Sequence, residues 1–194
     1  MTAALQLPDK QDWTVDDLAG LPPDLNYELI DGRLILPTPT LVHQVLGVEL
    51  VLMLRPNCPR GYVPAPDLSL KINRRNEPRP DVVVTNLRYA ARTPVPVDGA
   101  MLVIEVVSPT SQLRDMNAKT AVYAAAGVEH YWIVDPTIDG DVTMTVLQRF
   151  GGGSYERVTC TSKVFSTEVP YPITIDLPAL TALRDEYLAA QDEA

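Results

Sequence analysis

The stretch LVIEVVSPTSQLRDMNAK, from Leu102 to Lys119, decides the fold of this chain. Its first six residues are five aliphatic side chains and one carboxylate, Glu105. An apolar run of this length is typical of a central strand that is buried on both faces. An isolated ionised carboxylate in such a strand is costly unless a cation or hydrogen-bond donors meet it. The question that the sequence raises is therefore which group Glu105 faces.

The bulk composition predicts a soluble cytoplasmic protein. The chain has 194 residues, of which 46% are hydrophobic and 21% charged, as in ordinary globular domains. Its first residues lack a basic region followed by a long apolar one, so we expect no signal peptide. The longest apolar runs are far shorter than a bilayer span, so we expect no membrane partner. Cys58 and Cys160 lie far apart and outside any metal-binding spacing, which predicts two free thiols.

The net charge of −9 argues against a general polyanion binder, because nucleic-acid affinity depends largely on neutralising phosphates. The segment from Lys71 to Arg92 is different, since it carries six basic and two acidic residues, a local charge of +4. One interpretation is a solvated hairpin tip at NRRNEPR. The other is a basic face that binds nucleic acid, for which the candidate residues are Lys71, Arg74, Arg75 and Arg79.

Local patterns predict the elements that precede the Glu105 strand. Thr14 is a good N-cap for a short helix, and the turn DG in YELIDGRLIL indicates a hairpin. Apolar residues at helical spacing predict a helix over 39–54. The prolines of GYVPAPDLSLKI, Pro64 and Pro66, favour an irregular or edge strand. The short run DVVV, which starts at Asp81, predicts a buried strand.

The elements after the Glu105 strand are a helix over 112–126, a buried strand EHYWIVDP, an alternating antiparallel meander and a closing helix. This order predicts an α/β or α+β fold with helices packed on a sheet. No linker or repeat divides the chain, so we expect a single domain over 1–194. Its parts are an N-terminal helix-hairpin at 14–36, a core at about 39–136, and a C-terminal β-meander and helix at 141–190.

Two carboxylates, Asp81 and Glu105, converge if their strands are neighbours. Convergent carboxylates either share a proton or bind a hard cation such as Mg²⁺. Lys119 is the candidate third member, because the helix after the Glu105 strand returns over the sheet. The simpler interpretations are a turn residue for Asp81, a buried salt bridge for Glu105, and an exposed pair of Lys119 with Asp115.

Several motifs, in order, resemble the Uma-two family, a restriction-endonuclease-type branch of the PD-(D/E)XK nuclease superfamily. They are PDVVV, LVIEVVSPTS and RDMNAKTAVYAAAGVEHYWIVDP. The stretches NYELIDGRLI, PTPTLVHQ, VPAPDLSL and PYPITIDLPAL also match in order, so the resemblance runs roughly from Thr14 to Leu180. It implies a restriction-endonuclease-like central mixed β-sheet flanked by helices, with added antiparallel strands on the C-terminal side.

The resemblance also implies roles for individual residues. Asp81 and Glu105 would bind Mg²⁺ or Mn²⁺, with DNA as the partner and a homodimer by analogy. The motif lysine is expected two residues after the glutamate, where this chain has Val107. Its role would pass to Lys119, and Glu28 and His43 would support the site. For His43, a histidine satisfied by local hydrogen bonds at a helix start is an equal alternative.

Three hypotheses follow. The first is a metal-dependent endonuclease that hydrolyses DNA through Asp81, Glu105 and Lys119. The second is a non-catalytic binding or assembly module, favoured by Val107 and by the acidic net charge. The third, acid/base hydrolysis of another substrate, ranks last because no aromatic cluster supports it. We interpret His130 as structural, and Tyr123 and Trp132 as packing residues.

Overall fold

The computed structural model describes residues 10–22, 25–108, 113–137 and 140–192. In chain order, the elements are α1 (Val15–Leu18), β1 (Glu28–Ile30), β2 (Arg33–Ile35), α2 (Leu41–Leu54), β3 (Tyr62–Pro66), β4 (Leu70–Lys71), β5 (Val82–Asn86), β6 (Val95–Pro96), β7 (Ala100–Val106), α3 (Leu113–Ala125), β8 (His130–Asp135), β9 (Thr143–Gln148), β10 (Glu156–Thr161), β11 (Phe165–Thr167), β12 (Ile173–Ile175) and α4 (Leu177–Asp192). Two short 3-10 turns, Leu87–Tyr89 and Val97–Gly99, flank β6.

A mixed six-stranded sheet organises the described residues, in the order β10-β9-β8-β7-β5-β3. Strands β7 and β8 are parallel and are joined through α3, whereas the other neighbours in this sheet are antiparallel. Strand β7, which carries Glu105, lies in the interior of the sheet, as the apolar run predicts. The expected central mixed sheet is therefore present.

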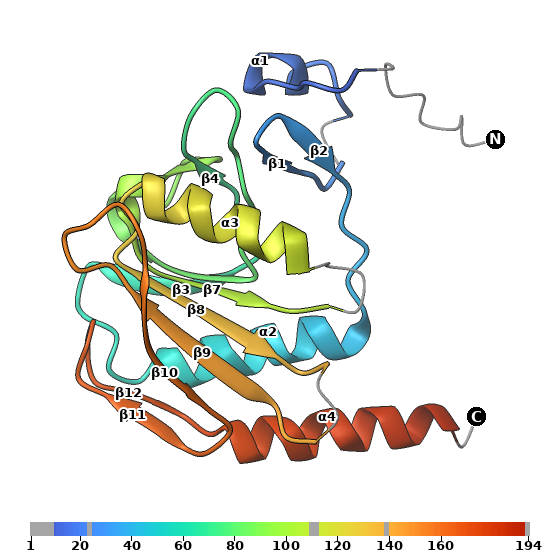
Figure 1. Ribbon diagram of the computed structural model, residues 1–194, viewed down its shortest axis with the longest axis vertical. Coiled ribbons are helices and arrows are strands. Elements are labelled where there is room, and N and C mark those ends of the chain that lie inside the picture. Colours follow the sequence, from blue (N-terminus) through green and yellow to red (C-terminus); the bar gives the residue numbers. More distant parts are fainter. Residues whose placement is uncertain (1–9, 23–24, 109–112, 138–139, 193–194) are drawn as a thin grey trace.

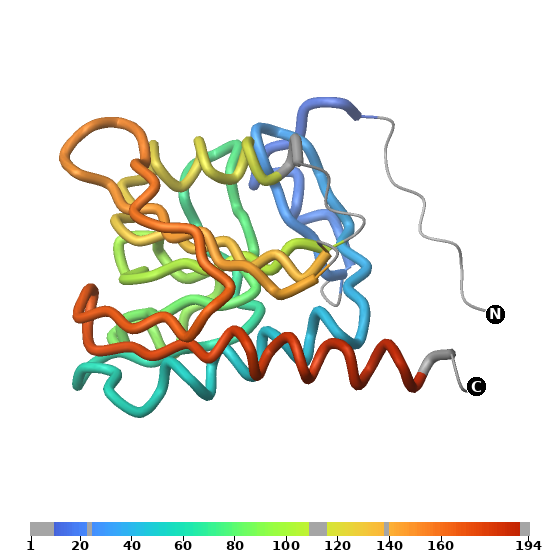
Figure 2. Tube along the Cα trace, turned by 60° about the horizontal axis from the view of Figure 1, so that its bottom comes forward, coloured from blue at the N-terminus to red at the C-terminus, as the bar shows by residue number. Residues whose placement is uncertain are grey.

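Helices cover both faces of this sheet (Figures 1 and 2). Helix α3 lies on one face, and α2, α4 and the β11–β12 hairpin lie on the other. The alternation along β7 explains the two layers. Leu102, Ile104 and Val106 pack toward α2, whereas Val103 packs in the same cluster as Tyr123 of α3. Glu105 therefore points to the α3 face, because side chains alternate along a strand.

The N-terminal hairpin docks onto the segment 75–77. Asp31 and Gly32 both adopt positive φ, 49° and 76°, at the DG turn that joins β1 to β2. Leu29 and Glu77 exchange backbone hydrogen bonds of 3.0 and 2.8 Å, and the Gly32 amide donates to the Arg75 carbonyl. The predicted hairpin is confirmed, and its docking brings β1 close to the central sheet.

The C-terminal strands depart from a simple meander. Strands β9 and β10 continue the central sheet beyond β8, whereas β11 and β12 form a separate two-stranded hairpin that packs near α2. At the other end of the sheet, β3 is an edge strand that includes Pro64 and Pro66, as predicted. Proline is tolerated at an edge because the missing amide needs no partner strand there.

Helix boundaries follow the local capping chemistry. Helix α2 starts at Leu41, because the Thr40 hydroxyl accepts a hydrogen bond from the His43 amide and so caps the first turn. Thr14 caps α1 together with Asp17, whose carboxylate accepts from the Thr14 amide. The predicted start of α3 at position 112 lies outside the described residues. None of the described helices is long and apolar enough to cross a lipid bilayer.

Candidate active site

The two predicted carboxylates come from opposite positions of two neighbouring strands. Val82 of β5 pairs with Ile104 of β7 in antiparallel register, so Asp81, one residue earlier, lies opposite Glu105. Residues directly opposite in an antiparallel pair project to the same side of the sheet. The condition that the sequence left open, adjacency of these strands, is therefore met.

Glu105 is 2% exposed and has a partner for each carboxylate oxygen. The Lys119 ammonium donates to Oε2 at 2.9 Å, and the Tyr123 hydroxyl donates to Oε1 at 2.8 Å. Both donors lie on α3, one helical turn apart, and so share one face of the helix. The buried charge thus faces a cation and a hydrogen-bond donor, as the cost of burial requires.

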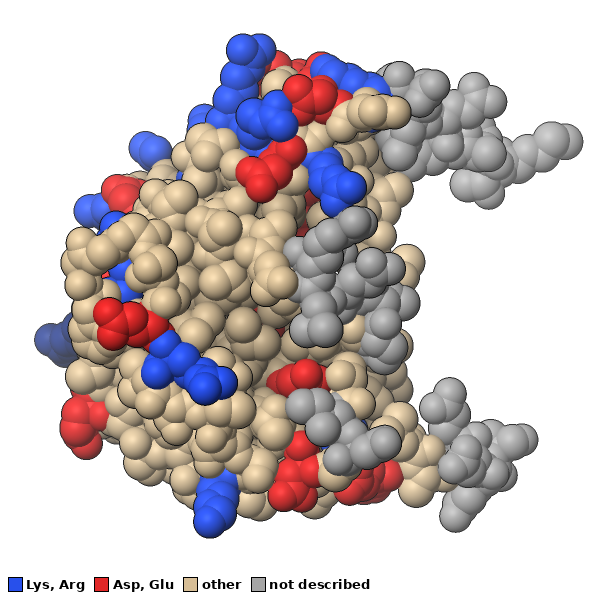
Figure 3. Space-filling model, viewed as in Figure 1, with Lys and Arg blue, Asp and Glu red and all other residues tan. Residues whose placement is uncertain are grey.

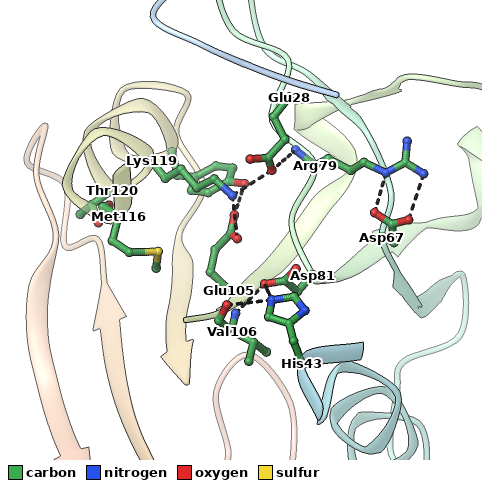
Figure 4. A network of polar contacts seen from close by, with 11 residues as sticks. Glu28, His43, Asp67, Arg79, Asp81, Glu105, Val106, Met116, Lys119 and Thr120 are labelled. Atoms are coloured by element: carbon green, nitrogen blue, oxygen red, sulfur yellow. Dashed lines mark hydrogen bonds and ion pairs between the residues drawn. The ribbon is translucent and has the colours of Figure 1, made fainter. Parts of the chain in front are cut away.

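Lys119 also contacts a carboxylate from the N-terminal hairpin. Its ammonium donates to Glu28 Oε1 at 2.8 Å, and the same oxygen accepts the Arg79 amide at 3.0 Å. Figure 4 shows Glu28 and Glu105 pointing toward the Lys119 amine from two sides. Lys119 is therefore held by two carboxylates within the described structure, and the side chain of Asp115 lies outside it.

Asp81 is tied to the end of β7 and to α2. Its Oδ2 accepts the Val106 amide at 2.6 Å, and His43 Nε2 lies 3.3 Å from Oδ2 and 3.0 Å from the Val106 carbonyl oxygen. Because both neighbours are acceptors, Nε2 carries the proton and donates. His43 Nδ1 is buried without a hydrogen-bond partner among the described residues.

The site has more negative than positive charge. Glu28, Asp81 and Glu105 meet one ammonium, Lys119. Burial raises the pKa of Glu105 to about 8; Lys119 opposes this rise, and Asp81 and Glu28 add to it. Burial would lower the pKa of Lys119, but the three carboxylates outweigh it and raise this pKa above its ordinary value. Burial would likewise lower the pKa of His43, but Asp81 and the Val106 carbonyl raise it.

These residues line a cavity of about 220 Å³. One wall is polar and includes Glu28, His43, Asp81, Glu105 and Lys119. The apolar lining residues come mainly from the segment 35–39, which starts at the last residue of β2 and precedes α2, together with Pro66 and Met116. The cavity therefore combines charged and apolar lining residues, as is common in ligand sites.

The donor set of the polar wall fits a hard cation. Asp81, Glu105 and the Val106 carbonyl present oxygen atoms, and Asp81 Oδ1 accepts no hydrogen bond from the described residues. Within those residues, no group of three His, Cys, Asp or Glu side chains is arranged to hold a metal ion. Mg²⁺ needs only one or two carboxylates, since water and substrate phosphate complete its shell. The excess negative charge also favours a divalent cation.

The predicted nucleic-acid residues carry their own acidic partners. Arg74 pairs with Asp16 at 2.9 Å and Arg75 with Asp12 at 2.5 Å. Figure 3 shows Lys and Arg side chains interleaved with Asp and Glu at the end of the molecule where α1 lies. Arg79 pairs with Asp67, whereas Lys71 is exposed and has no ion pair within the described part of the chain. Their role in binding nucleic acid stays a prediction.

Sequence reasoning missed two contacts of the site. Tyr123 packs against Tyr131 at a ring-centroid distance of 5.1 Å, as expected of a packing residue, but its hydroxyl also holds Glu105. The spacing of four residues from Lys119 was the available signal. No sequence pattern predicted the Asp67–Arg79 pair, because Asp67 follows an irregular strand and adopts a φ of 49°. Trp132 packs edge-on against Phe165, and His130 is buried.

The comparisons with known proteins agree with this arrangement. The sequence model of the Uma2 family, described as "Putative restriction endonuclease", matches residues 13–178. The chain belongs to the Uma2 family. The predicted resemblance is thereby confirmed, and membership of Uma2 supports a nuclease-like function.

A solved structure shows the same fold. It is the crystal structure of "a putative nuclease belonging to DUF820" from Anabaena variabilis ATCC 29413. The two chains share 17% sequence identity with a TM-score of 0.68, over 88% of this chain and 98% of the other. At 17% identity, this similarity shows only that the two proteins share a fold. A search of curated proteins found no match.

Proposed function

We propose that this Uma2 protein is a metal-dependent endonuclease that hydrolyses DNA phosphodiester bonds. One observation carries the proposal: Asp81 and Glu105 lie opposite each other on adjacent strands, with the Lys119 ammonium 2.9 Å from Glu105. Family membership and the oxygen-rich cavity support it. The charged wall offers a place for a cation and a phosphate group together.

Asp81, Glu105 and the Val106 carbonyl are the groups that would hold Mg²⁺ or Mn²⁺. When bound, the cation would supply Lewis acidity and a more acidic water molecule. Lys119 is protonated at neutral pH because its pKa is raised, so it acts as a hydrogen-bond donor and positive charge rather than as a base. In that form it can orient the attacking water or stabilise negative charge on the phosphate.

Glu28 and His43 have positioning roles in this proposal. Glu28 fixes the Lys119 amine from the side opposite Glu105, and its own position is fixed by the Arg79 amide. His43 donates from Nε2 toward Asp81 and the Val106 carbonyl, which keeps these two oxygen donors together. The segment 35–39 contributes mainly apolar side chains to the lining of the same cavity.

A plasmid-nicking assay tests this proposal. Supercoiled plasmid is incubated with the purified protein and Mg²⁺ or Mn²⁺, and nicked and linear products are separated on agarose. We expect Asp81→Asn and Glu105→Gln each to lower the rate by about 10²-fold or more, since each removes a charged oxygen donor. Nicking that survives both substitutions would show that the assigned site is wrong.

Glu156→Gln is the matched control. Glu156 is exposed at the start of β10 and lies, by register through β9 and β8, level with Leu102 at the opposite end of β7 from the site. It changes the same functional group and the same net charge as Glu105→Gln, and we expect it to retain wild-type nicking.

A non-catalytic module is the second candidate, because both Glu105 oxygens already accept hydrogen bonds and Val107 replaces the motif lysine. Calorimetry with Mn²⁺ separates the two. Binding that Asp81→Asn weakens favours the nuclease, whereas absence of metal binding favours the module. By analogy with nucleases of this fold we also propose a homodimer, which sedimentation analysis would test.

A further inference from the structure

Arg79 is the arginine among the described residues that line the cavity. It lies two residues before Asp81, and its amide donates to Glu28, so its backbone is fixed beside the carboxylates. Its side chain lines the same cavity as Asp81, Glu105 and Lys119. Within the residues that the structure describes, it supplies the guanidinium of this cavity.

The guanidinium of Arg79 forms a two-point pair with Asp67. The distances are 2.5 Å from Nε to Oδ1 and 3.1 Å from a terminal nitrogen to Oδ2 (Figure 4). Asp67 adopts a φ of 49°, a conformation that Asp tolerates better than most residues, and its amide donates to the Asp81 carbonyl. The Asp67 carboxylate is thus held by its backbone at the cavity wall.

This pair differs from the Lys119 pairs in exposure. Arg79 and Asp67 are 27% and 48% exposed, whereas Lys119 is 11% exposed and is held by two buried carboxylates. A solvent-exposed ion pair contributes little net stability, so its partner is exchanged at low cost. Arg79 therefore exchanges its carboxylate for another anion at a lower cost than Lys119 does.

A phosphodiester group has the geometry to replace Asp67. Both a carboxylate and a phosphate present two oxygens to the planar fork of a guanidinium, and both form paired, charge-assisted hydrogen bonds. Among the described residues that line the cavity, Glu28, Asp67, Asp81 and Glu105 stand against Lys119, His43 and Arg79. A nucleic-acid backbone entering this cavity therefore needs a cation that is not already held by the buried carboxylates.

We propose that Arg79 binds a backbone phosphate of the nucleic acid and that Asp67 is a competitor for it within the protein. In the free protein the Arg79 guanidinium donates to the Asp67 carboxylate. When substrate binds, the guanidinium donates to a phosphodiester group instead. This inference rests on the proposed nuclease function, since it assigns the phosphate contact of that same cavity. Removal of Asp67 should then strengthen binding, whereas removal of Arg79 should weaken it.

Fluorescence anisotropy with short fluorescein-labelled DNA, single-stranded and duplex, tests this exchange. Ca²⁺ replaces Mg²⁺ so that binding is measured apart from cleavage. We expect Arg79→Ala to raise Kd by about tenfold and to lower the slope of log K against log salt by about one. Asp67→Asn should lower Kd several-fold and raise this slope by about one, since it frees one cation.

The double variant and a second ion pair complete the design. Arg79→Ala combined with Asp67→Asn should bind like Arg79→Ala alone, because Asp67 acts only through Arg79. The pair Arg88–Asp98 is the matched control: its distance is 3.0 Å, it is exposed, and it lies beyond the opposite end of β5 from Asp81. Arg88→Ala and Asp98→Asn should leave Kd and the salt slope unchanged. Arg79→Gln, which keeps the side-chain length, repeats the test if Arg79→Ala folds poorly.

The outcomes separate this inference from the proposed function. Three outcomes would overturn the exchange. They are weaker DNA binding by Asp67→Asn, unchanged binding by both single variants, and no DNA binding by either the wild type or Asp67→Asn. If the protein nicks DNA but Arg79→Ala and Asp67→Asn both bind it like the wild type, the nuclease proposal holds and the exchange at Arg79 is wrong. The predicted opposite shifts in Kd, without any nicking, would support the exchange and contradict hydrolysis.

Discussion

Two regions of the molecule pair basic side chains with carboxylates at similar distances but in opposite surroundings. The buried cluster consists of Glu28, Glu105 and Lys119, with contacts of 2.8 and 2.9 Å. The surface tip consists of the pairs Arg74–Asp16 and Arg75–Asp12, with contacts of 2.9 and 2.5 Å. In the buried cluster the side chains are at most 11% exposed, whereas Arg74 and Asp16 are 72% and 70% exposed.

The difference shows that distance alone does not set the energy of an ion pair. At the surface tip each arginine has its own aspartate, and water solvates both, so the pairs are close to neutral for stability. In the buried cluster one ammonium serves two carboxylates with little water, and loss of the cation leaves buried charges uncompensated. The substitutions below test this difference, from the largest expected effect to the smallest.

Lys119→Met should have the largest effect on stability. It keeps much of the aliphatic stem but removes the charge that compensates Glu28 and Glu105. Because breaking one side of a buried ion pair leaves the other charge unpaired, we expect a loss of about 3–5 kcal/mol in the free energy of unfolding, measured by urea denaturation. Lys71→Met, at an exposed lysine of β4, is the control and should lie within about 0.5 kcal/mol of wild type.

A small loss in Lys119→Met would contradict the view that Lys119 is the main counter-charge of the cluster. The loss should also be smaller below about pH 8 than above it, because protonation of Glu105 removes part of the uncompensated charge.

Tyr123→Phe should have the next largest effect. It keeps the ring against Tyr131 but removes the hydroxyl that donates to Glu105 at 2.8 Å. Above about pH 8 Glu105 is ionised, and hydrogen bonds to charged groups contribute about 1.5–3 kcal/mol, so we expect a loss in this range when urea denaturation is done there. Tyr155→Phe is the control, since its hydroxyl donates at the same distance to a neutral carbonyl, that of Val128. It should cost about 0.5–1.5 kcal/mol, and equal losses would argue against a charged Glu105.

The pH dependence of stability should show the raised pKa of Glu105. Burial raises this pKa from 4.5 to about 8, so between these values the folded state binds more protons than the unfolded state. The contribution is therefore fully present below pH 4.5 and is lost as the pH rises through about 8. We expect the free energy of unfolding, measured with a chelator present, to fall with pH in this window more steeply in wild type than in Glu105→Gln.

Other titratable groups also change the pH dependence of stability, mostly outside the pH window between 4.5 and about 8. The raised pKa of Lys119 changes stability only above its ordinary value of 10.5, and the lowered pKa of Asp17 only below 3.8. His43, whose pKa is raised by Asp81 and the Val106 carbonyl and also by Glu105, contributes with the same sign from 6.5 upward, and Glu105→Gln removes the part that comes from Glu105. Equal slopes in wild type and Glu105→Gln would show that Glu105 is ionised throughout the window.

The sequence predicted those features that depend on local patterns. The apolar run of β7, the DG turn and the Thr14 cap act within a few residues, and the structure has each of them. The meeting of Asp81 with Glu105 was predictable as a condition, because their strands follow each other closely in the chain. That Lys119 reaches Glu105 also follows from the short return of α3 over β7.

Contacts between distant segments were not predictable from the residues alone. Glu28 reaches Lys119, 91 residues away, only because the β1–β2 hairpin docks onto residues 75–77, and it entered the site through the family resemblance. The aspartates that neutralise Arg74 and Arg75 come from the chain near α1, about sixty residues earlier, and no periodicity signals this contact. Charge counts along a segment therefore overstate the free positive charge of the surface tip.

Arg74→Ala should have the smallest effect. Its partner Asp16 is as exposed as Arg74 itself, so the carboxylate left behind is solvated by water. We expect a change in the free energy of unfolding of about 0–1 kcal/mol, and one that disappears in high salt, because screening acts on exposed charges. Asp16→Asn should give the same small change. A loss near that of Lys119→Met would mean that the surface tip is organised by its ion pairs, and the contrast between the two regions would fail. A small change would instead indicate that the two regions differ in stability because of water access and the number of carboxylates per cation.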